Sequence, residues 1–148
     1  MQLVITMKRI IPSLALLLVA ITIWPTFVIA QQEPIPFVVQ LTRTAENYGH
    51  RRVFLQIDKI LNDLGEDNLK IEVVAYENGI QSLLAENKET SQLLTKLVNR
   101  GVTFKACRIS MRAWSLKEEE FPLEVEFVPA GAPEMIRLQM QGYKYWRP

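Results

Sequence analysis

Short β-branched runs alternate along this chain with segments whose apolar residues recur at helical spacing. This alternation constrains the fold more than any other feature, because alternating strands and helices build βαβ units around a parallel sheet. The sequence therefore predicts an α/β domain with helices on both faces of the sheet. We expect strands at residues 36–42, 70–76, 102–109, 125–128 and 143–146. We expect helices at residues 53–64, 93–98, 110–120 and 133–140, and short helical turns at 80–84.

Glycines and short polar residues mark where these elements begin and end. Gly65 and Gly101 each follow a helical segment, which is a common position for a helix-terminating glycine. Ser110 is a candidate N-cap for the helix that follows the third strand. Asn78 and Gly79 form a turn after the second strand, and we expect Gly79 to supply a positive φ angle there.

The first thirty residues have the composition of a secretory signal peptide. A Lys-Arg pair at positions 8 and 9 precedes an apolar stretch, and Val28 and Ala30 are small enough for the −3 and −1 positions of a cleavage site. We therefore expect residues 1–30 to be removed and residues 31–148 to form one exported domain, periplasmic or secreted. The alternative is an uncleaved anchor, because the apolar stretch approaches the roughly 20 residues of a membrane span.

The mature domain is almost neutral. The leader holds two of the 17 basic residues and none of the 16 acidic ones, so residues 31–148 keep 15 basic and 16 acidic residues, a net charge of −1. A nucleic-acid partner would need a basic face. We therefore expect no nucleic acid as a partner, and no membrane contact after the leader is removed.

Cys107 is the only cysteine of the chain. It cannot form an intramolecular disulfide, so its thiol is buried and inert, joined to another chain, or free for chemistry. Cys107 ends the third predicted strand, and open α/β sheets bind ligands at the carboxyl ends of their strands. Arg108 and Arg112 favour the thiolate, although both could instead pair with the acidic run at residues 118–120. The sequence thus indicates a reactive cysteine, with a buried core cysteine as the alternative.

Neither a metal nor a nucleotide cofactor is expected. His50 is the only histidine and is far from Cys107 in the sequence, so no zinc-ligand spacing exists. The turn at residues 129–133, after the fourth strand, has no phosphate-binding signature.

Apolar residues near the C-terminus are expected to serve in packing. We expect the core to include the apolar face of the last predicted helix: Met135, Ile136, Leu138 and Met140. We expect core or subunit-interface positions for the C-terminal aromatic residues, Tyr143, Tyr145 and Trp146.

Four segments of the mature chain match, in order, a family of small α/β sulfur-relay proteins. They are residues 73–79 (VVAYENG), 97–107 ending in G-V-x-F-x-x-C, 128–131 (VPAG) and 138–148 (L-Q-x-Q-G-Y-x-Y-x-x-P). On these segments the chain resembles the DsrE/DsrF-like family, especially its exported single-domain members. The resemblance implies a flavodoxin-like three-layer α/β/α sandwich with a mainly parallel five-stranded sheet. It also implies homo-oligomers, commonly trimers or hexamers.

The resemblance further implies a role for Cys107. In family members that relay sulfur, a cysteine after the third strand carries a persulfide, and Cys107 lies at that position. Many relatives have a His-Gly pair where this chain has Asn78 and Gly79. Asparagine can donate a hydrogen bond but does not exchange a proton near neutral pH. We expect Cys107 to be the reactive residue and to be surrounded by substrate-binding residues: Asn78, Gly79, Arg108 and Arg112.

The expected function is the binding or relay of sulfane sulfur on Cys107, as a sulfur carrier or sulfurtransferase-like protein. Asn78 would orient the donor, and Arg108 and Arg112 would stabilise the anions. The partner would be a sulfur-donor or acceptor protein or a small thiol. One alternative is a non-catalytic, homo-oligomeric binding module in which Cys107 is structural. Another is a redox-sensing thiol that forms an intermolecular disulfide.

Overall fold

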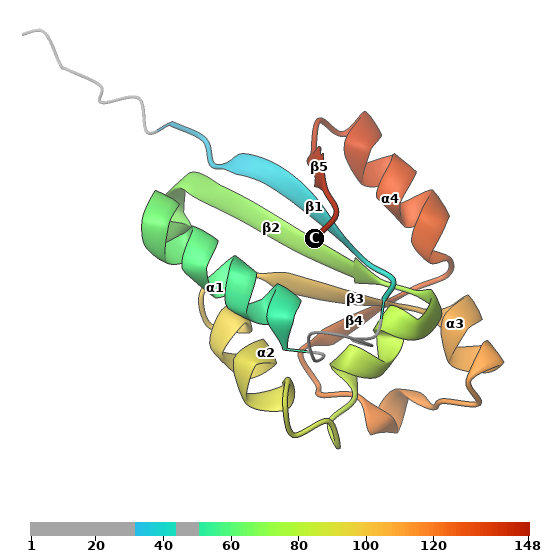
Figure 1. Cartoon of the computed structure of the whole chain (residues 1–148). Helices are drawn as coiled ribbons and strands as arrows, with labels where there is room; N and C mark the ends of the chain where they lie inside the picture. The colour runs from blue at the N-terminus through green and yellow to red at the C-terminus, as the bar shows by residue number, and fades with distance from the viewer. Residues whose placement is uncertain (1–31, 44–50) are drawn as a thin grey trace, which may run out of the picture. The chain divides into compact units, whose positions relative to one another are not determined.

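The computed structural model describes residues 32–43 and 51–148. The predicted signal peptide and His50 lie outside the described residues. Five strands form one sheet in the order β4-β3-β2-β1-β5, and every pair of neighbouring strands is parallel (Figure 1). The strands are β1 Ile35–Leu41, β2 Leu69–Ala75, β3 Thr103–Cys107, β4 Val125–Val128 and β5 Lys144–Trp146. The parallel sheet predicted from the alternating pattern is confirmed.

Helices cover both faces of the sheet. The α-helices are α1 Arg52–Leu64, α2 Ser91–Val98, α3 Arg108–Ala113 and α4 Gly131–Met140. The 3₁₀ segments are η1 Glu66–Asn68, η2 Glu77–Leu83 and η3 Glu118–Glu120. The strands β2, β3 and β4 are added on one side of β1, whereas β5 is added on the other. Right-handed crossovers therefore place α4 on the face opposite to α1 and α2. This arrangement is the flavodoxin-like α/β/α sandwich.

Successive residues of the central strands point to different faces, and both faces are apolar. Val39, Val73 and Phe104 belong to the larger core, on the side of α1 and α2, where the rings of Phe54 and Phe104 stack with their centroids 5.4 Å apart. A smaller core beneath α4 contains five buried residues: Val38, Val74, Met135, Leu138 and Tyr143. Strands buried on both faces read as continuous hydrophobic runs, which explains why the sequence revealed them.

The chain after β3 differs from the expected helix at residues 110–120. The helix α3 begins at Arg108 and has six residues, because Ser115 takes a left-handed φ of 55° and ends it. Cys107, rather than Ser110, occupies the N-cap position. The acidic run forms the separate turn η3, closed by the Glu120 carboxylate, which accepts the backbone N–H of Lys117 at 2.6 Å.

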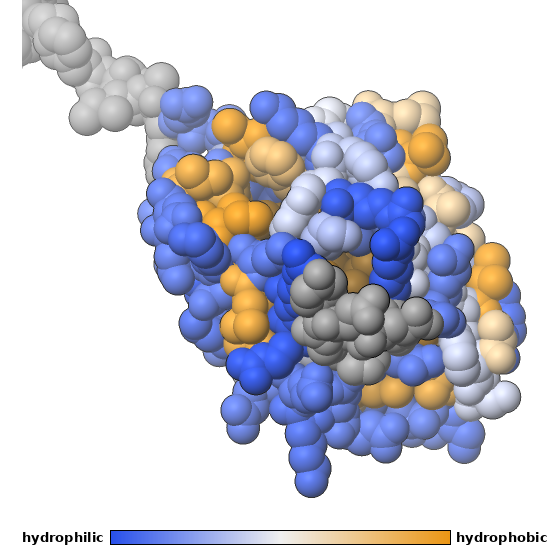
Figure 2. Space-filling view, in the orientation of Figure 1, coloured by the Kyte–Doolittle hydropathy of each residue, from blue (hydrophilic) through white to orange (hydrophobic). Residues whose placement is uncertain are grey.

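The outer side of α4 also differs from expectation. The helix begins at Gly131, two residues earlier than predicted, and buries Met135 and Leu138. Ile136 and Met140 point away from the sheet and are 57% and 84% exposed, so the prediction that they belong to the core was wrong. In the space-filling view, apolar patches lie over α1 and α4 among mostly hydrophilic side chains (Figure 2).

Gly79 does not have the positive φ that we expected of a turn glycine; Glu77, two residues earlier, has a φ of 52°. Gly79 is needed for a different reason. A Cβ atom at residue 79 would lie 2.2 Å from the Leu41 carbonyl oxygen and 2.8 Å from the Thr42 nitrogen. The absence of a side chain lets η2 approach the end of β1, where the Gly79 N–H donates to the Thr42 carbonyl at 3.1 Å.

Candidate functional site

Cys107 ends β3 among the carboxyl ends of three neighbouring strands. It lies opposite Val128 of β4, and the residue before it, Ala106, lies opposite Ala75 at the end of β2. Its backbone is extended (φ −79°, ψ 117°), and α3 starts at the next residue. The strand-end position predicted from the sequence is therefore confirmed. The side chain is a free thiol but only 3% exposed.

Hydrogen bonds from two helices converge on the sulfur. The backbone N–H of Gly131, the first residue of α4, donates to Sγ of Cys107 at 3.1 Å. Burial alone would raise the pKa of the Cys107 thiol, but it is outweighed by hydrogen bonds from the backbone and side chain of Ser110 and the backbone N–H groups of Gly131 and Ile109. The pKa is therefore lowered, because hydrogen bonds to the charged form favour it.

Gly131 permits this contact because it has no side chain. A Cβ atom there would lie 2.7 Å from three carbon atoms of Tyr76, the residue that follows β2. The Tyr76 side chain therefore packs directly against the start of α4, and no larger residue fits between them. In the sequence, the turn at residues 129–133 has two features, the absence of a phosphate-binding signature and the VPAG segment of the family resemblance, and the sequence reasoning missed Gly131 as a thiol contact.

Ser110 connects the exits of β2 and β3. Its hydroxyl oxygen accepts the backbone N–H of Glu77 at 2.8 Å. Ser110 is buried and contributes to lowering the pKa of Cys107. Glu77 itself has a left-handed φ of 52°, which is uncommon for a residue with a side chain. The sequence marked Ser110 only as a helix cap.

The predicted substrate-binding residues are only partly brought together. Gly79 is buried, whereas Asn78 is exposed. Asn78 follows Glu77, whose backbone N–H donates to Ser110. Arg108 forms an ion pair with Glu118, and its guanidinium carbon lies 5.3 Å from the centroid of the Phe127 ring. Arg112 is exposed in the last turn of α3. The main causes of the lowered thiol pKa are hydrogen bonds rather than the two arginines.

A row of polar side chains continues from Tyr76 toward β5. The amide Nε2 of Gln40 donates to the Tyr76 hydroxyl at 2.6 Å, and the Tyr145 hydroxyl donates to Oε1 of Gln40. Burial, followed by the nearby Glu77 carboxylate, raises the pKa of Tyr76. Tyr145 is 48% exposed, so it is not a core residue in this chain. A small pocket beside Gln40 is lined by the end of β1 and the two residues after it, by Val53 of α1 and by the last two residues of the chain; Cys107 is not among these lining residues.

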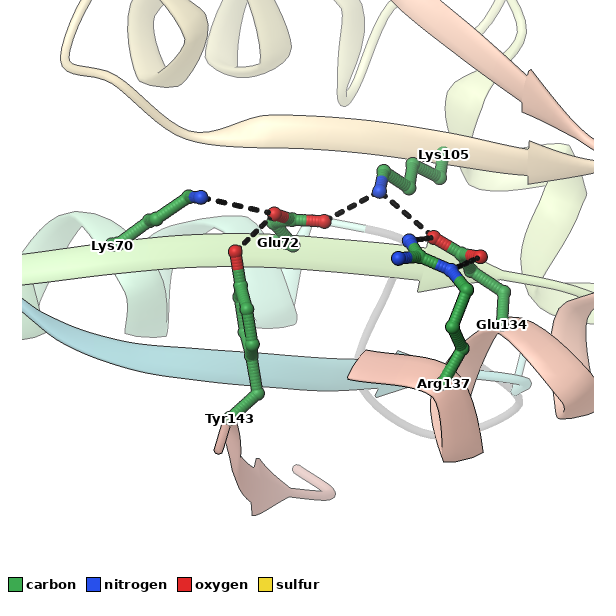
Figure 3. Close-up of polar contacts among 6 residues, drawn as sticks. All are labelled: Lys70, Glu72, Lys105, Glu134, Arg137 and Tyr143. Atoms are coloured by element: carbon green, nitrogen blue, oxygen red, sulfur yellow. Dashed lines mark hydrogen bonds and ion pairs between the residues drawn. The ribbon is translucent and has the colours of Figure 1, made fainter. Parts of the chain in front are cut away.

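A set of six side chains beneath α4, which we name the buried charge network, was missed by the sequence reasoning (Figure 3). Lys105 of β3 lies between two carboxylates, 2.5 Å from Oε2 of Glu72 and 2.8 Å from Oε1 of Glu134. Lys105, Glu72 and Glu134 are each less than 10% exposed. The network consists of Lys70, Glu72, Lys105, Glu134, Arg137 and Tyr143. A signal was present in the sequence, because Glu72 and Lys105 are charged residues inside otherwise apolar strands.

The network keeps its two carboxylates and Lys105 charged. The Arg137 guanidinium donates to Glu134 and, with help from Lys105 and against the effect of burial, lowers the Glu134 pKa to about 2. Burial opposes ionisation of Glu72, but hydrogen bonds from Lys105 and Tyr143 hold its pKa below the usual range. Burial also opposes the charge of Lys105, yet its two carboxylate partners raise its pKa. Paired and hydrogen-bonded charges are the kind that a protein interior tolerates.

Two features, a metal-binding group of side chains and a membrane-spanning helix, are absent from the part of the chain that the structure describes. Among these residues, no three His, Cys, Asp or Glu side chains are grouped as a metal site requires. No helix among them is long and apolar enough to cross a membrane.

A comparison with family models identifies one family, and a comparison with solved structures finds the same fold in other proteins. The model of the DsrE/DsrF-like family matches residues 37–147. The fold is similar to that of MTH1491 from Methanobacterium thermoautotrophicum, described as a protein of unknown function, with a TM-score of 0.63 and 27% identity over 79% of this chain and 100% of that chain. It is also similar to the YchN protein of E. coli, with a TM-score of 0.63 and 15% identity over 77% of this chain and 99% of that chain. A comparison with curated proteins finds no match.

Proposed function

Because the chain belongs to the DsrE/DsrF-like family, we propose that it binds and relays sulfane sulfur as a persulfide on Cys107. The observation that carries this proposal is the set of hydrogen bonds to the sulfur from Gly131, Ser110 and Ile109, which lowers the thiol pKa in spite of burial. The thiolate is the nucleophilic form of cysteine. The sequence of residues 1–30 supports export, so the reaction would take place in the periplasm or outside the cell.

The transfer needs no oxidant and no added base. The Cys107 thiolate attacks the outer sulfur of a donor persulfide, R–S–SH, so that the Cys107 S–S bond forms, the donor S–S bond breaks and the donor leaves as a thiolate, R–S⁻. An acceptor thiolate then attacks the outer sulfur and breaks the Cys107 S–S bond, which regenerates the Cys107 thiolate. The backbone N–H of Gly131 stabilises the anionic sulfur in both steps. Asn78, on the exposed turn beside Ser110, is the residue that we propose orients the donor.

We expect the purified protein, exposed to a small-molecule persulfide and then freed from it, to gain the mass of one sulfur atom at Cys107. Cys107→Ser should gain none, because a serine hydroxyl is not nucleophilic at neutral pH. Mass spectrometry of the intact protein and of its peptides measures the mass gain of the wild type and of the variant. A persulfide sulfur should be lost after treatment with a reductant. An equal gain in the Cys107→Ser variant would contradict the proposal, as would a wild-type protein that stays unloaded although its thiol reacts with an alkylating reagent.

One observation favours the alternative, a binding module in which Cys107 is a packing residue: the side chain is 3% exposed. In that case the native thiol would react only after unfolding, and Cys107→Ser would lower stability without affecting any sulfur transfer. A redox-sensing thiol would instead give a covalent dimer under oxidation, visible on a non-reducing gel.

We also propose that the protein assembles into a homo-oligomer, a trimer or hexamer, through the outer side of α4. Ile136 and Met140 are apolar and more than half exposed there, and exposed apolar patches mark interaction surfaces. The double variant Ile136→Lys/Met140→Lys should reduce the mass measured by light scattering to that of one chain. Leu55→Lys on α1, where the leucine is 42% exposed, is the matched control and should leave the mass unchanged. If Leu55→Lys lowered the mass and the double variant did not, the interface would not lie on α4.

A further inference from the structure

The first turn of α4 contacts β3 at two points, and both involve residues of the same face of the strand. The Gly131 N–H reaches Sγ of Cys107 at 3.1 Å, and the Glu134 carboxylate accepts the Lys105 ammonium at 2.8 Å. Cys107 and Lys105 are two residues apart along β3, so their side chains lie on the same face. Gly131 and Glu134 are three residues apart, within one turn of the helix. The four residues therefore form a closed ring between strand and helix.

The apolar contacts of α4 are made with β1, β2 and Tyr76. Its buried residues Met135 and Leu138 pack against Val38 of β1 and Val74 of β2, and the Tyr76 side chain packs against Gly131. This packing fixes the distance of the helix from the sheet but does not join its first turn to β3. That connection is made by the polar contacts of the ring, together with β4, whose last residue, Val128, pairs with Cys107 and lies three residues before Gly131.

Resting on the function proposed above, we propose that Lys105 and Glu134 are positioning residues for Cys107. Their ion pair holds the first turn of α4 against β3, so that the Gly131 N–H stays within hydrogen-bond distance of the sulfur. Glu72 supports Lys105 from β2, and Arg137 supports Glu134 from the next turn of α4 (Figure 3). The part of the buried charge network around Lys105 and Glu134 therefore serves the thiol, although its charges do not touch the reacting atoms.

A direct electrostatic effect of the pair on the sulfur makes the opposite prediction for one variant. Removing the negative charge of Glu134 would, by electrostatics alone, make the Cys107 thiolate easier to form and lower the thiol pKa. If Glu134 acts by positioning, its removal frees the first turn of α4, weakens the N–H···S bond and raises the thiol pKa. The sign of the change separates the two explanations.

The experiment is a titration of the thiolate ultraviolet absorbance of the native full-length protein, with Cys107→Ser as the blank. This measurement needs no reagent to reach the buried sulfur. We expect Glu134→Met, which keeps the length of the side chain but removes its acceptors, to move the inflection up by about one pH unit, the usual value of one hydrogen bond to a charged group. The amide proton of Gly131 should also exchange faster. Glu134→Gln, which keeps an acceptor oxygen and is the milder change should Glu134→Met not fold, should give a smaller upward shift.

Two further variants complete the test. Lys105→Arg keeps the ion pair and should leave the inflection near the wild-type value. Lys70→Met removes a cation from the other end of the network, where the lysine is 56% exposed and 3.7 Å from Glu72, and should also leave it unchanged. A downward or absent shift in both Glu134 variants would overturn the positioning role. The titration does not depend on sulfur loading. A protein that never accepts a persulfide can still show the upward shift, so failure of the positioning role and failure of the proposed function are distinguishable.

Discussion

Gly79→Ala is expected to lower the free energy of unfolding by about 3–5 kcal/mol, a loss at the upper end for single substitutions. The added Cβ atom would lie 2.2 Å from the Leu41 carbonyl oxygen and 2.5 Å from its carbonyl carbon. These are backbone atoms at the end of β1, which cannot rotate away as a side chain could. The start of η2 would have to move, and the Gly79 N–H would lose the Thr42 carbonyl. Urea unfolding followed by circular dichroism measures the change.

Gly101→Ala is the matched control for Gly79→Ala. Gly101 has a left-handed φ of 84°, and a Cβ atom there would meet no atom within 4 Å. Its substitution should therefore cost only the strain of the left-handed conformation, about 1–2 kcal/mol. A loss in Gly79→Ala no larger than that in Gly101→Ala would contradict the close approach to β1 as the requirement at residue 79.

Lys105→Met is expected to cost about 3 kcal/mol of stability at neutral pH. The substitution leaves the Glu72 and Glu134 carboxylates buried without the ammonium that lies within 2.8 Å of both. Removing one partner of a buried ion pair is costly, since the other charge stays in a poorly solvating environment. The loss should stay at the lower end of the range of about 3–5 kcal/mol for a broken buried pair, because Tyr143 and Arg137 still contact the two carboxylates. Lys59→Met, which removes an exposed pair with Asp63, should change stability by less than about 1 kcal/mol.

The cost of Lys105→Met should also depend on pH. The folded pKa of Glu134 is about 2, below the ordinary value of 4.5, mainly because of Arg137 and then Lys105. A carboxyl group with a lowered pKa stabilises the fold fully above its unfolded pKa, and this stabilisation is lost as pH falls toward the folded value. The difference between wild type and variant should therefore be large at neutral pH and shrink as the pH falls toward about 2. A difference that grows on acidification would contradict this assignment.

How far the sequence predicted the fold depended on how local each signal was. The strands that end in Ala75 and Cys107 are mainly apolar runs, interrupted by Glu72 and Lys105, and such runs are recognisable without any knowledge of their neighbours. The glycine signal for the end of α1, Gly65, was equally local. The length of α3 was predicted wrongly, since a polar stretch at helical spacing gave no sign of the left-handed Ser115 that ends the helix. The outward orientation of Ile136 and Met140 depended on the sheet beneath α4, which the helix pattern does not describe.

The candidate site also has a part that the sequence predicted and a part that it did not. The sequence by itself determined that the chain is an α/β protein of this family and that Cys107 ends a strand at the edge where such sheets bind ligands. Only the tertiary structure decided what surrounds the thiol. The Gly131 N–H lies 24 residues from Cys107 in the sequence, Glu134 lies 29 residues from Lys105, and the Glu77 N–H lies 33 residues from the Ser110 hydroxyl that accepts it. Hydrogen bonds and ion pairs act over a few ångströms in space, so their partners are fixed by how the strands and helices pack, and no pattern along the chain records them.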